Sequence, residues 1–388
     1  MNNLAIKIIR LQQTRIQQLG FIAHIHFELE GCFEHNLSSS TLLYAQINQL
    51  FSQYNIAGNL VSEYWYNQWE FVSQFNGQSP LEEAHNLNFV ITHLSRLAAK
   101  VGVTKTLIQP VVWGGDQGKL AQNCKNVFSD DKRAVHIPNA IQLNISASSL
   151  IGENIVANRD FGELLQQCFL QTSLPCCLLY LPEEAAFERF ALKSKYGLAR
   201  ELCSPTDISG GHQGSIALYL KQGKHNQLMG EKMLLVDHNN QPLISEYHWQ
   251  KTARIEHRLG ASSQHYDPYA NVVFALANLI NALELFYSNT KNLDEVYGVD
   301  ILPLHSSISL PKSLYNKGQK LGAIELFIQD SWLPKSINKV QQQMLANESS
   351  VEQLKRENSL HLAVYDQQLG DQFKQQILAK YNVLSLTH

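Results

Sequence analysis

The stretch FIAHIHFELEGCF, residues 21–33, decides the fold of this 388-residue chain. Polar and apolar side chains alternate along it, as expected of a β-strand whose side chains point alternately to two faces. Glu28 and Glu30 therefore point to the same side. An isolated pair of this kind is typical of a solvated strand face. The neighbouring Phe27 and Phe33 instead favour a partly buried pair.

A second strand-like segment, NLVSEYWYNQWEFVSQF at residues 59–75, repeats this spacing. Gln68 and Glu70 lie two residues apart and share a face. Glu63 precedes Glu70 by an odd number of residues, so on one flat strand it faces away. A turn or bulge at residues 66–67 brings it back to the same face.

A third segment, TARIEHRL at residues 252–259, sets Arg254, Glu256 and Arg258 on one strand face. Carboxylates gathered among aromatic side chains repel one another and stay ionised only if cations neutralise them. Several hard oxygen ligands suit Mg²⁺ or Mn²⁺. The sequence therefore predicts a metal site built on strands.

Hydrophobic periodicity places other elements around these three segments. It predicts helices at residues 3–19, 39–54, 83–101, 160–172, 183–202 and 269–288, and strands at 106–113, 140–146, 216–221 and 232–237. The stretch 310–334 and the residues after it have a helical, Gln- and Asn-rich character.

Three motifs in order resemble the catalytic domain of the glutamine synthetase family. FELEGCF resembles its Glu-x-Glu-Phe strand, SEYWYNQWEF its Glu-x-x-x-x-Gln-Trp-Glu-Phe segment, and ARIEHR its Arg-Ile-Glu-x-Arg strand. Pro268 and Tyr269 match the helix start that follows, and LPKSLYNKG and LGDQFKQQILAKY resemble the C-terminal helices. The resemblance covers residues 20–388. It implies an α+β fold, a large curved antiparallel sheet with outer helices, with 1–302 as catalytic domain and 303–388 as its C-terminal helical part.

The resemblance also implies roles for single residues. The metal that faces the acceptor carboxylate matches Glu30, Glu63 and Glu70. The second metal, which aligns ATP, matches Glu28 and Glu256, and Arg258 matches an arginine that binds glutamate and the transferring phosphoryl group. The implied enzyme belongs to nitrogen metabolism. ATP phosphorylates a glutamate-like γ-carboxylate, and an amine or ammonia then attacks the acyl phosphate.

Several positions depart from the family pattern. Gln142, in NAIQLNIS, replaces a metal-binding His, while Asn144 and Ser146 keep the flanking pattern. Gln142 is the candidate metal ligand at this position. Gln68, Asn144 and Ser146 are the candidate substrate and nucleotide contacts. The family's arginine pair falls near SGGHQGSIALYL, which has none, and Glu201 is the candidate for the ammonia-deprotonating Glu. A catalytically inactive paralogue that binds a nucleotide, an amino acid or a partner therefore stays open as the rival.

Bulk properties narrow the partners and the compartment. A formal net charge of −3 gives no reason to expect nucleic acid. Six irregularly spaced cysteines fit reduced thiols in the cytoplasm. The apolar segment 269–287 is broken by Asn and Glu and predicts a buried helix rather than a membrane span. The family's amino-terminal β-grasp domain has no match. We therefore expect a smaller homo-oligomer, most simply a dimer, with room for a separate β-grasp partner.

Other chemistry-bearing residues favour ordinary structural roles. They are the strand pair His24 and His26, the glycine loops WGGDQG and SGGHQG, and Asp207. None has the flanking residues that a metal, phosphate or base motif requires.

Overall fold

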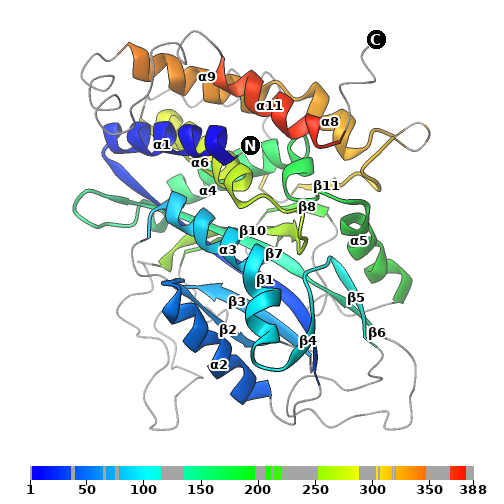
Figure 1. The fold of residues 1–388 in the computed structure, drawn as a ribbon. Coiled ribbons are helices and arrows are strands. Elements are labelled where there is room, and N and C mark those ends of the chain that lie inside the picture. Colours follow the sequence, from blue (N-terminus) through cyan, green and yellow to red (C-terminus); the bar gives the residue numbers. More distant parts are fainter. Residues whose placement is uncertain are drawn as a thin grey trace.

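The described part of the chain combines one large antiparallel sheet with α-helices packed against it (Figure 1). The computed structural model describes residues 2–35, 40–63, 67–74, 78–114, 135–196, 207–210, 214–220, 252–287, 303–304, 306–316, 318, 320–346 and 368–381. This mixed architecture confirms the α+β class predicted from the sequence.

The main sheet has seven strands within these residues. Their order is β2 (Gly58–Ser62), β3 (Gln68–Ser73), β1 (Phe21–His35), β7 (Ala140–Ser149), β10 (Arg254–Ala261) and β9 (Ile216–Tyr219), with β4 (Val103–Leu107) also paired to β1. Two small antiparallel sheets join β5 (Val111–Gly114) to β6 (Val135–Pro138), and β8 (Asp207–Ser209) to β11 (Ser307–Ser309). Strands far apart in the sequence therefore meet in the middle of the main sheet.

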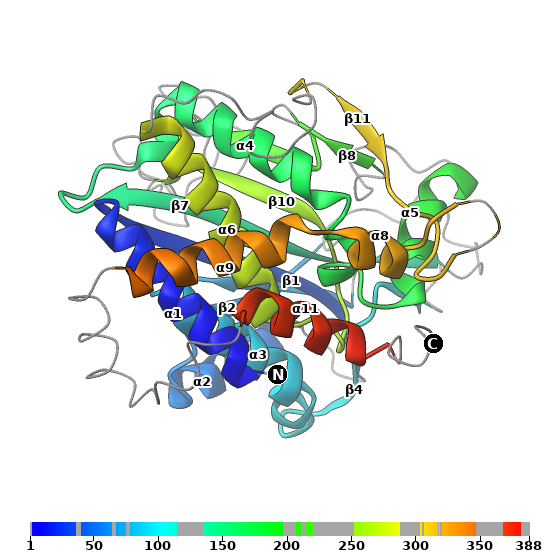
Figure 2. The ribbon, with the colours of Figure 1, turned by 90° about the horizontal axis from the view of Figure 1, so that it is seen from above.

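Helices form a double layer beside the sheet. The helices that contact its strands are α1 (Asn2–Gln18), α2 (Ser40–Gln53), α3 (Pro80–Ala99) and α4 (Arg159–Ser173), and α6 (Pro268–Tyr287) packs among α1, α3 and α4. Figure 2 shows α9 (Trp332–Leu345) and α11 (Leu369–Ala379) crossing over α1 and α6. The remaining helical elements are α5 (Glu184–Tyr196), α8 (Ala323–Gln329), η1 (Ile155–Ala157) and η2 (Cys177–Leu179).

One face of the main sheet packs into the hydrophobic core. Ile25, Phe27 and Leu29 on β1 are completely buried, and they lie opposite Ile145, Leu143 and Ile141 on β7. The residues between them on β1 point to the other face, as the alternation in residues 21–33 predicts. That other face carries Glu28 and Glu30.

Helix α6 is the one described helix long and apolar enough to cross a membrane. Its most apolar window is 89% buried within the protein, so it is a core helix, as its sequence predicts. Its buried Asn271 and Asn278 donate to backbone carbonyls, so these polar residues, which interrupt its apolar sequence, are satisfied inside the protein. Four described cysteines are buried and not joined in disulfides, namely Cys32, Cys168, Cys176 and Cys177.

Three predicted elements need correction. The single strand predicted at 106–113 is two strands, β4 and β5, in different sheets. The segment 59–75 forms a hairpin, in which β2 pairs antiparallel with β3. The stretch 310–322 contains no helix among its described residues, and helix α8 begins only after Gly322. The strand predicted at 232–237 lies outside the described residues.

Candidate active site

The strand register gathers the predicted carboxylates on one face of the sheet. Glu30 lies directly opposite Glu70, and Glu28 lies directly opposite Gln142. In the hairpin Val61 lies opposite Glu70, so Glu63, two residues further along, shares their face. Glu63 and Glu70 therefore share a face, as the sequence predicts, while residues 64–66 between them lie outside the described residues. We call Glu28, Glu30, Glu63 and Glu70 the acidic flank.

A glycine allows β1 and β3 to meet closely at this flank. A Cβ atom at Gly31 would collide with the ring of Trp69, which lies opposite it on β3. Trp69 packs on Phe33 with 5.3 Å between ring centroids, on the core side of the sheet. The sequence Glu-Gly-Cys-Phe thus fixes the strand pair whose other side presents Glu30 and Glu70.

Like charges and burial act strongly on Glu30. Its carboxylate accepts a hydrogen bond from the Ala140 amide at 2.7 Å. Burial, followed by the negative charges of Glu63 and Glu28, raises the pKa of Glu30 to about 8, against the opposing effects of Ala140 and Arg189. The acidic flank therefore favours protons or metal cations over free ionised carboxylates.

The residues of β10 form a second group on the same face, which we call the arginine flank: Arg254, Glu256 and Arg258. Glu256 accepts from Arg254 at 3.1 Å and lies 3.4 Å from the Nε of Arg258. Burial and the nearby Glu28 nevertheless raise the pKa of Glu256 to about 7, while both arginines oppose the rise. The three side chains predicted to share a strand face thus interact directly.

Asn144 joins the two flanks. Its amide donates to Glu28 at 3.4 Å, and its carbonyl oxygen accepts from the Nε of Arg254 at 2.6 Å. The guanidinium of Arg254 also stacks on Tyr219, 4.7 Å from the ring centroid. Asn144 is 1% exposed, so its amide holds the protein's own groups. A role in substrate binding stays a prediction.

Two other predicted contacts lie at the margins of this face. Gln68 is buried and donates to Asn139 at 3.0 Å, which ties β3 to the start of β7. Ser146 is buried opposite His24.

The histidine between His24 and Glu28 on β1, His26, is uncharged. Burial, with smaller effects of His24 and Arg254, lowers the pKa of His26 to about 3, so this imidazole is neutral at physiological pH.

Sequence reasoning missed a buried arginine behind the acidic flank. Arg189 of α5 is 2% exposed and donates to the carbonyls of Asn139, Leu259 and Gly260 at 2.6–3.1 Å. These carbonyls lie at the start of β7 and beside the irregularity in β10 that follows His257. Helical spacing after the buried Ala186 was the available signal for its burial.

The donor set suits a divalent cation in chemistry but is not preassembled. Within the described ranges, no three His, Cys, Asp or Glu side chains converge closely enough to hold a metal ion. The oxygen donors nevertheless share one face, and the neighbouring negative charges raise the pKa of Glu30. Side-chain rotation toward a cation would relieve that repulsion. The predicted base Glu201 lies outside the described residues, as do His212 and Gln213.

Comparison with known proteins gives a likeness of fold. No family model matches the chain, and no curated protein matches it in sequence. The crystal structure of a novel glutamine synthase homolog superposes with a TM-score of 0.53 at 14% identity, covering 95% of this chain and 74% of the other. A GmaS/ADP complex gives 0.50 at 12% identity, covering 97% and 73%.

Glutamine synthetase from Plasmodium falciparum gives a TM-score of 0.50 at 10% identity, covering 91% of this chain and 78% of the other. The chain therefore has the fold of the glutamine synthetase catalytic domain, as its three motifs predict. Identities this low establish the fold alone, so the activity rests on the chemistry of the site.

Proposed function

We propose that this chain is an ATP- and Mg²⁺-dependent carboxylate–amine ligase of the glutamine synthetase type that acts through an acyl phosphate. The observation that carries the proposal is the gathering of oxygen donors on one face of the sheet. They are Glu28, Glu30, Glu63, Glu70, Gln142 and Glu256. A fold shared with a protein solved as an ADP complex supports a nucleotide as the partner ligand.

Two metal ions would divide these donors. The ion nearest the acceptor carboxylate would be held by Glu30, Glu63 and Glu70. The ion nearest the nucleotide would be held by Glu28, Gln142 and Glu256, because Gln142 lies opposite Glu28 and Asn144 lies opposite Glu256. Bound cations of this kind neutralise charge and align oxygens during phosphoryl transfer.

Arg258 would contact the transferring phosphoryl group. Its side chain is 34% exposed, whereas that of Arg254 is 9% exposed and held by Asn144 and Glu256. Arg258 is therefore the arginine of this flank with a guanidinium open to a ligand. Glu256 would orient it through the 3.4 Å contact and keep the charge of the pair near zero before ATP binds.

A second function is binding without turnover, as in an inactive paralogue. The observation that favours it is the arginine flank, where Arg254 and Arg258 already neutralise Glu256. A carboxylate with two guanidinium partners has less to gain from a metal. In that case the glutamate-like carboxylate and the amine or ammonia either bind without being converted or do not bind at all.

Calorimetry with Mn²⁺ tests the metal site. We expect wild type to bind at millimolar concentration or below, and Glu30→Ala or Glu70→Ala to weaken binding about tenfold or more. Glu34→Ala is the matched control, because Glu34 is exposed on the same strand and pairs with Lys105. If the wild-type protein does not bind Mn²⁺ at millimolar concentration, the ligase proposal loses its basis.

Metal-dependent ATPase activity, measured over a panel of amino acids and amines, distinguishes the ligase from the inactive paralogue.

A further inference from the structure

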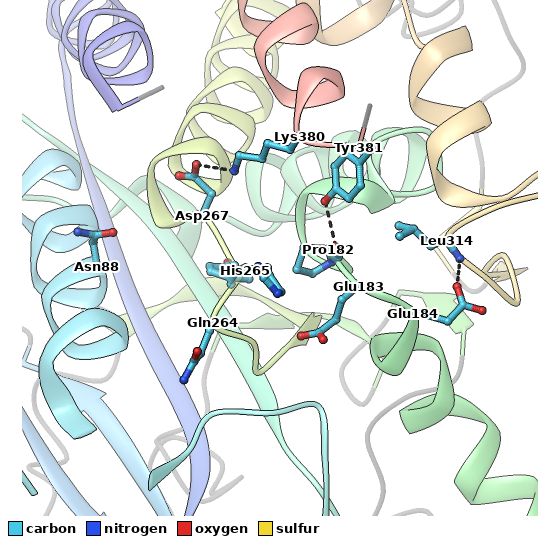
Figure 3. A pocket seen from close by; sticks show the side chains of 11 residues that line it. Asn88, Pro182, Glu183, Glu184, Gln264, His265, Asp267, Leu314, Lys380 and Tyr381 are labelled. Carbon is cyan, nitrogen blue, oxygen red and sulfur yellow. Dashed lines mark hydrogen bonds and ion pairs between the residues drawn. The ribbon is translucent and has the colours of Figure 1, made fainter. Parts of the chain in front are cut away.

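A cavity of about 600 Å³ is lined by residues that belong to neither the acidic flank nor the arginine flank (Figure 3). Its walls come from five segments: α3, the start of α5, the loop between β10 and α6, Leu314 before α8, and the end of α11. Helices α3 and α11 belong to the helical layers beside the sheet (Figures 1 and 2). The volume is within the range of small-molecule sites. We propose that this cavity binds a small primary amine in its ammonium form, with Glu183 as the counter-ion.

Fixed contacts hold the walls in place. Lys380, at the end of α11, pairs with Asp267 at 3.2 Å. The hydroxyl of Tyr381 donates to the carbonyl of Pro182 at 3.1 Å. Asp267 also accepts from the first backbone amides of α6 at 3.0 and 3.1 Å. The cavity is therefore built from anchored groups.

The charges in the wall leave one carboxylate available. Asp267 is neutralised by Lys380 and by the backbone amides that it accepts from. Both oxygens of Glu184 are occupied by the Ser313 hydroxyl and the Leu314 amide, at 2.8–2.9 Å. Glu183 accepts from the Ser263 hydroxyl, and among the described residues no cation pairs with it. An ammonium ligand would give Glu183 the cationic partner that the described residues do not supply.

Neutral polar groups beside Glu183 suit the remaining donors of an ammonium. The Tyr381 hydroxyl donates to Pro182, so its oxygen keeps lone pairs that accept. Burial first, and then neighbours that include Tyr315, Glu183 and Asp267, raise the pKa of Tyr381, so it stays protonated. Tyr381 and Glu183 both line the cavity. An ammonium has three donors and no acceptor, which matches these acceptors.

Ethanolamine and ethylene glycol are a matched pair of probes. They have almost the same size, and ethanolamine carries an ammonium where ethylene glycol carries a hydroxyl. We expect calorimetry on the full chain to show saturable binding of ethanolamine and none of ethylene glycol. Equal behaviour of the two probes would overturn the proposal without the need for any variant.

Substitutions then locate the site. Glu183→Gln should weaken ethanolamine binding about tenfold or more, because charge-assisted hydrogen bonds are the strong ones. Glu188→Gln, at an exposed position on helix α5, which begins directly after Glu183, should leave it unchanged. Glu70→Gln on the acidic flank should also leave it unchanged, which separates this site from the proposed metal site. Undiminished binding in a folded Glu183→Gln protein would refute the assignment.

Discussion

The acidic flank and the arginine flank handle the same chemical group in two ways. On β10, Glu256 is held by two guanidinium groups, and yet burial and Glu28 raise its pKa to about 7. On β1, Glu30 has the buried Arg189 behind it, and burial and its carboxylate neighbours raise its pKa to about 8. The carboxylates of both flanks therefore bind protons more tightly than free carboxylates do. Only the arginine flank has cationic side chains, Arg254 and Arg258, on the same strand as its carboxylate.

This difference indicates how each flank would treat a ligand. The acidic flank has carboxylates that repel, so a divalent cation is the partner that relieves it. The arginine flank has two guanidinium groups for one carboxylate, and the side chain of Arg258 is the more exposed of the two, so an anionic phosphoryl group is its natural partner. A ligase needs both properties on one face, which is what the sheet register supplies.

The largest expected effect comes from breaking the support behind the acidic flank. Arg189→Met keeps an unbranched apolar side chain in place of the aliphatic part of arginine and removes the donors to the carbonyls of Asn139, Leu259 and Gly260. Buried acceptors left without donors should lower the free energy of unfolding by about 3 to 5 kcal/mol. Urea unfolding measures this loss. Arg159→Met, at an exposed position, should leave the midpoint unchanged, and an equally unchanged midpoint in Arg189→Met would show that the buried contacts are dispensable.

The arginine flank is tested by comparing its two arginines. Arg258→Ala should lower metal-dependent ATP turnover by roughly a hundredfold, because it removes a donor to the developing negative charge. Arg254→Ala should act mainly on stability, because Arg254 is buried against Asn144, Glu256 and Tyr219. Steady-state kinetics and thermal unfolding of both variants separate the two effects. Wild-type turnover in Arg258→Ala would show that the role taken from the family resemblance is wrong.

The pH dependence of the free energy of unfolding tests the carboxylates of both flanks and does not require the protein to be an active enzyme. The pKa of Glu30 and that of Glu256 are raised in the folded state, so between about pH 5 and about pH 8 the folded protein holds protons that the unfolded chain has released. In metal-free buffer the free energy of unfolding should therefore fall by about 1 to 3 kcal/mol as pH rises through this window.

Glu30→Gln should flatten that dependence, and Mn²⁺ should reverse it, because metal ligands must be deprotonated. Glu34→Gln on the same strand, where Glu34 pairs with Lys105, should keep the wild-type slope. Urea unfolding at several pH values, with chelator or with Mn²⁺, gives the measurement. Stability that rises with pH in chelator would contradict the raised pKa values.

Local pattern was enough to predict the strand faces and the three motifs, because the alternation of side chains depends on neighbours in the sequence. It placed Glu28 with Glu30, and it required a turn that returns Glu63 to the side of Glu70. It did not predict that β7 lies between β1 and β10, since that order depends on pairing between segments more than a hundred residues apart.

The rest of the site depends on contacts that periodicity does not encode. The spacing within α5 marks position 189 as buried but does not say which carbonyls its guanidinium meets. The irregularity after His257 likewise shows only in the pairing with β7. The stretch 310–322 was predicted as helix from its composition. Its described residues instead contact other elements, as when Ser313 donates to Glu184.

The smallest expected effect comes from Gln142→His, which places the histidine implied by the family resemblance beside Glu28 of the acidic flank. Gln142 lies opposite Glu28, where directly paired side chains are within contact range, and the family resemblance places a metal-binding His at this position. Imidazole nitrogen is a better ligand for a transition-metal ion than an amide oxygen, so Gln142→His should raise Mn²⁺ affinity by about threefold to tenfold, within the range seen for ligand-sphere changes. Gln142→Ala should lower it, and the gain for Mg²⁺ should be smaller because Mg²⁺ prefers oxygen donors. Calorimetry of wild type and both variants with both metals gives the six affinities. If neither His nor Ala at position 142 changes Mn²⁺ binding, Gln142 does not face the bound ion, and the second metal would then be held from Glu28 and Glu256 alone.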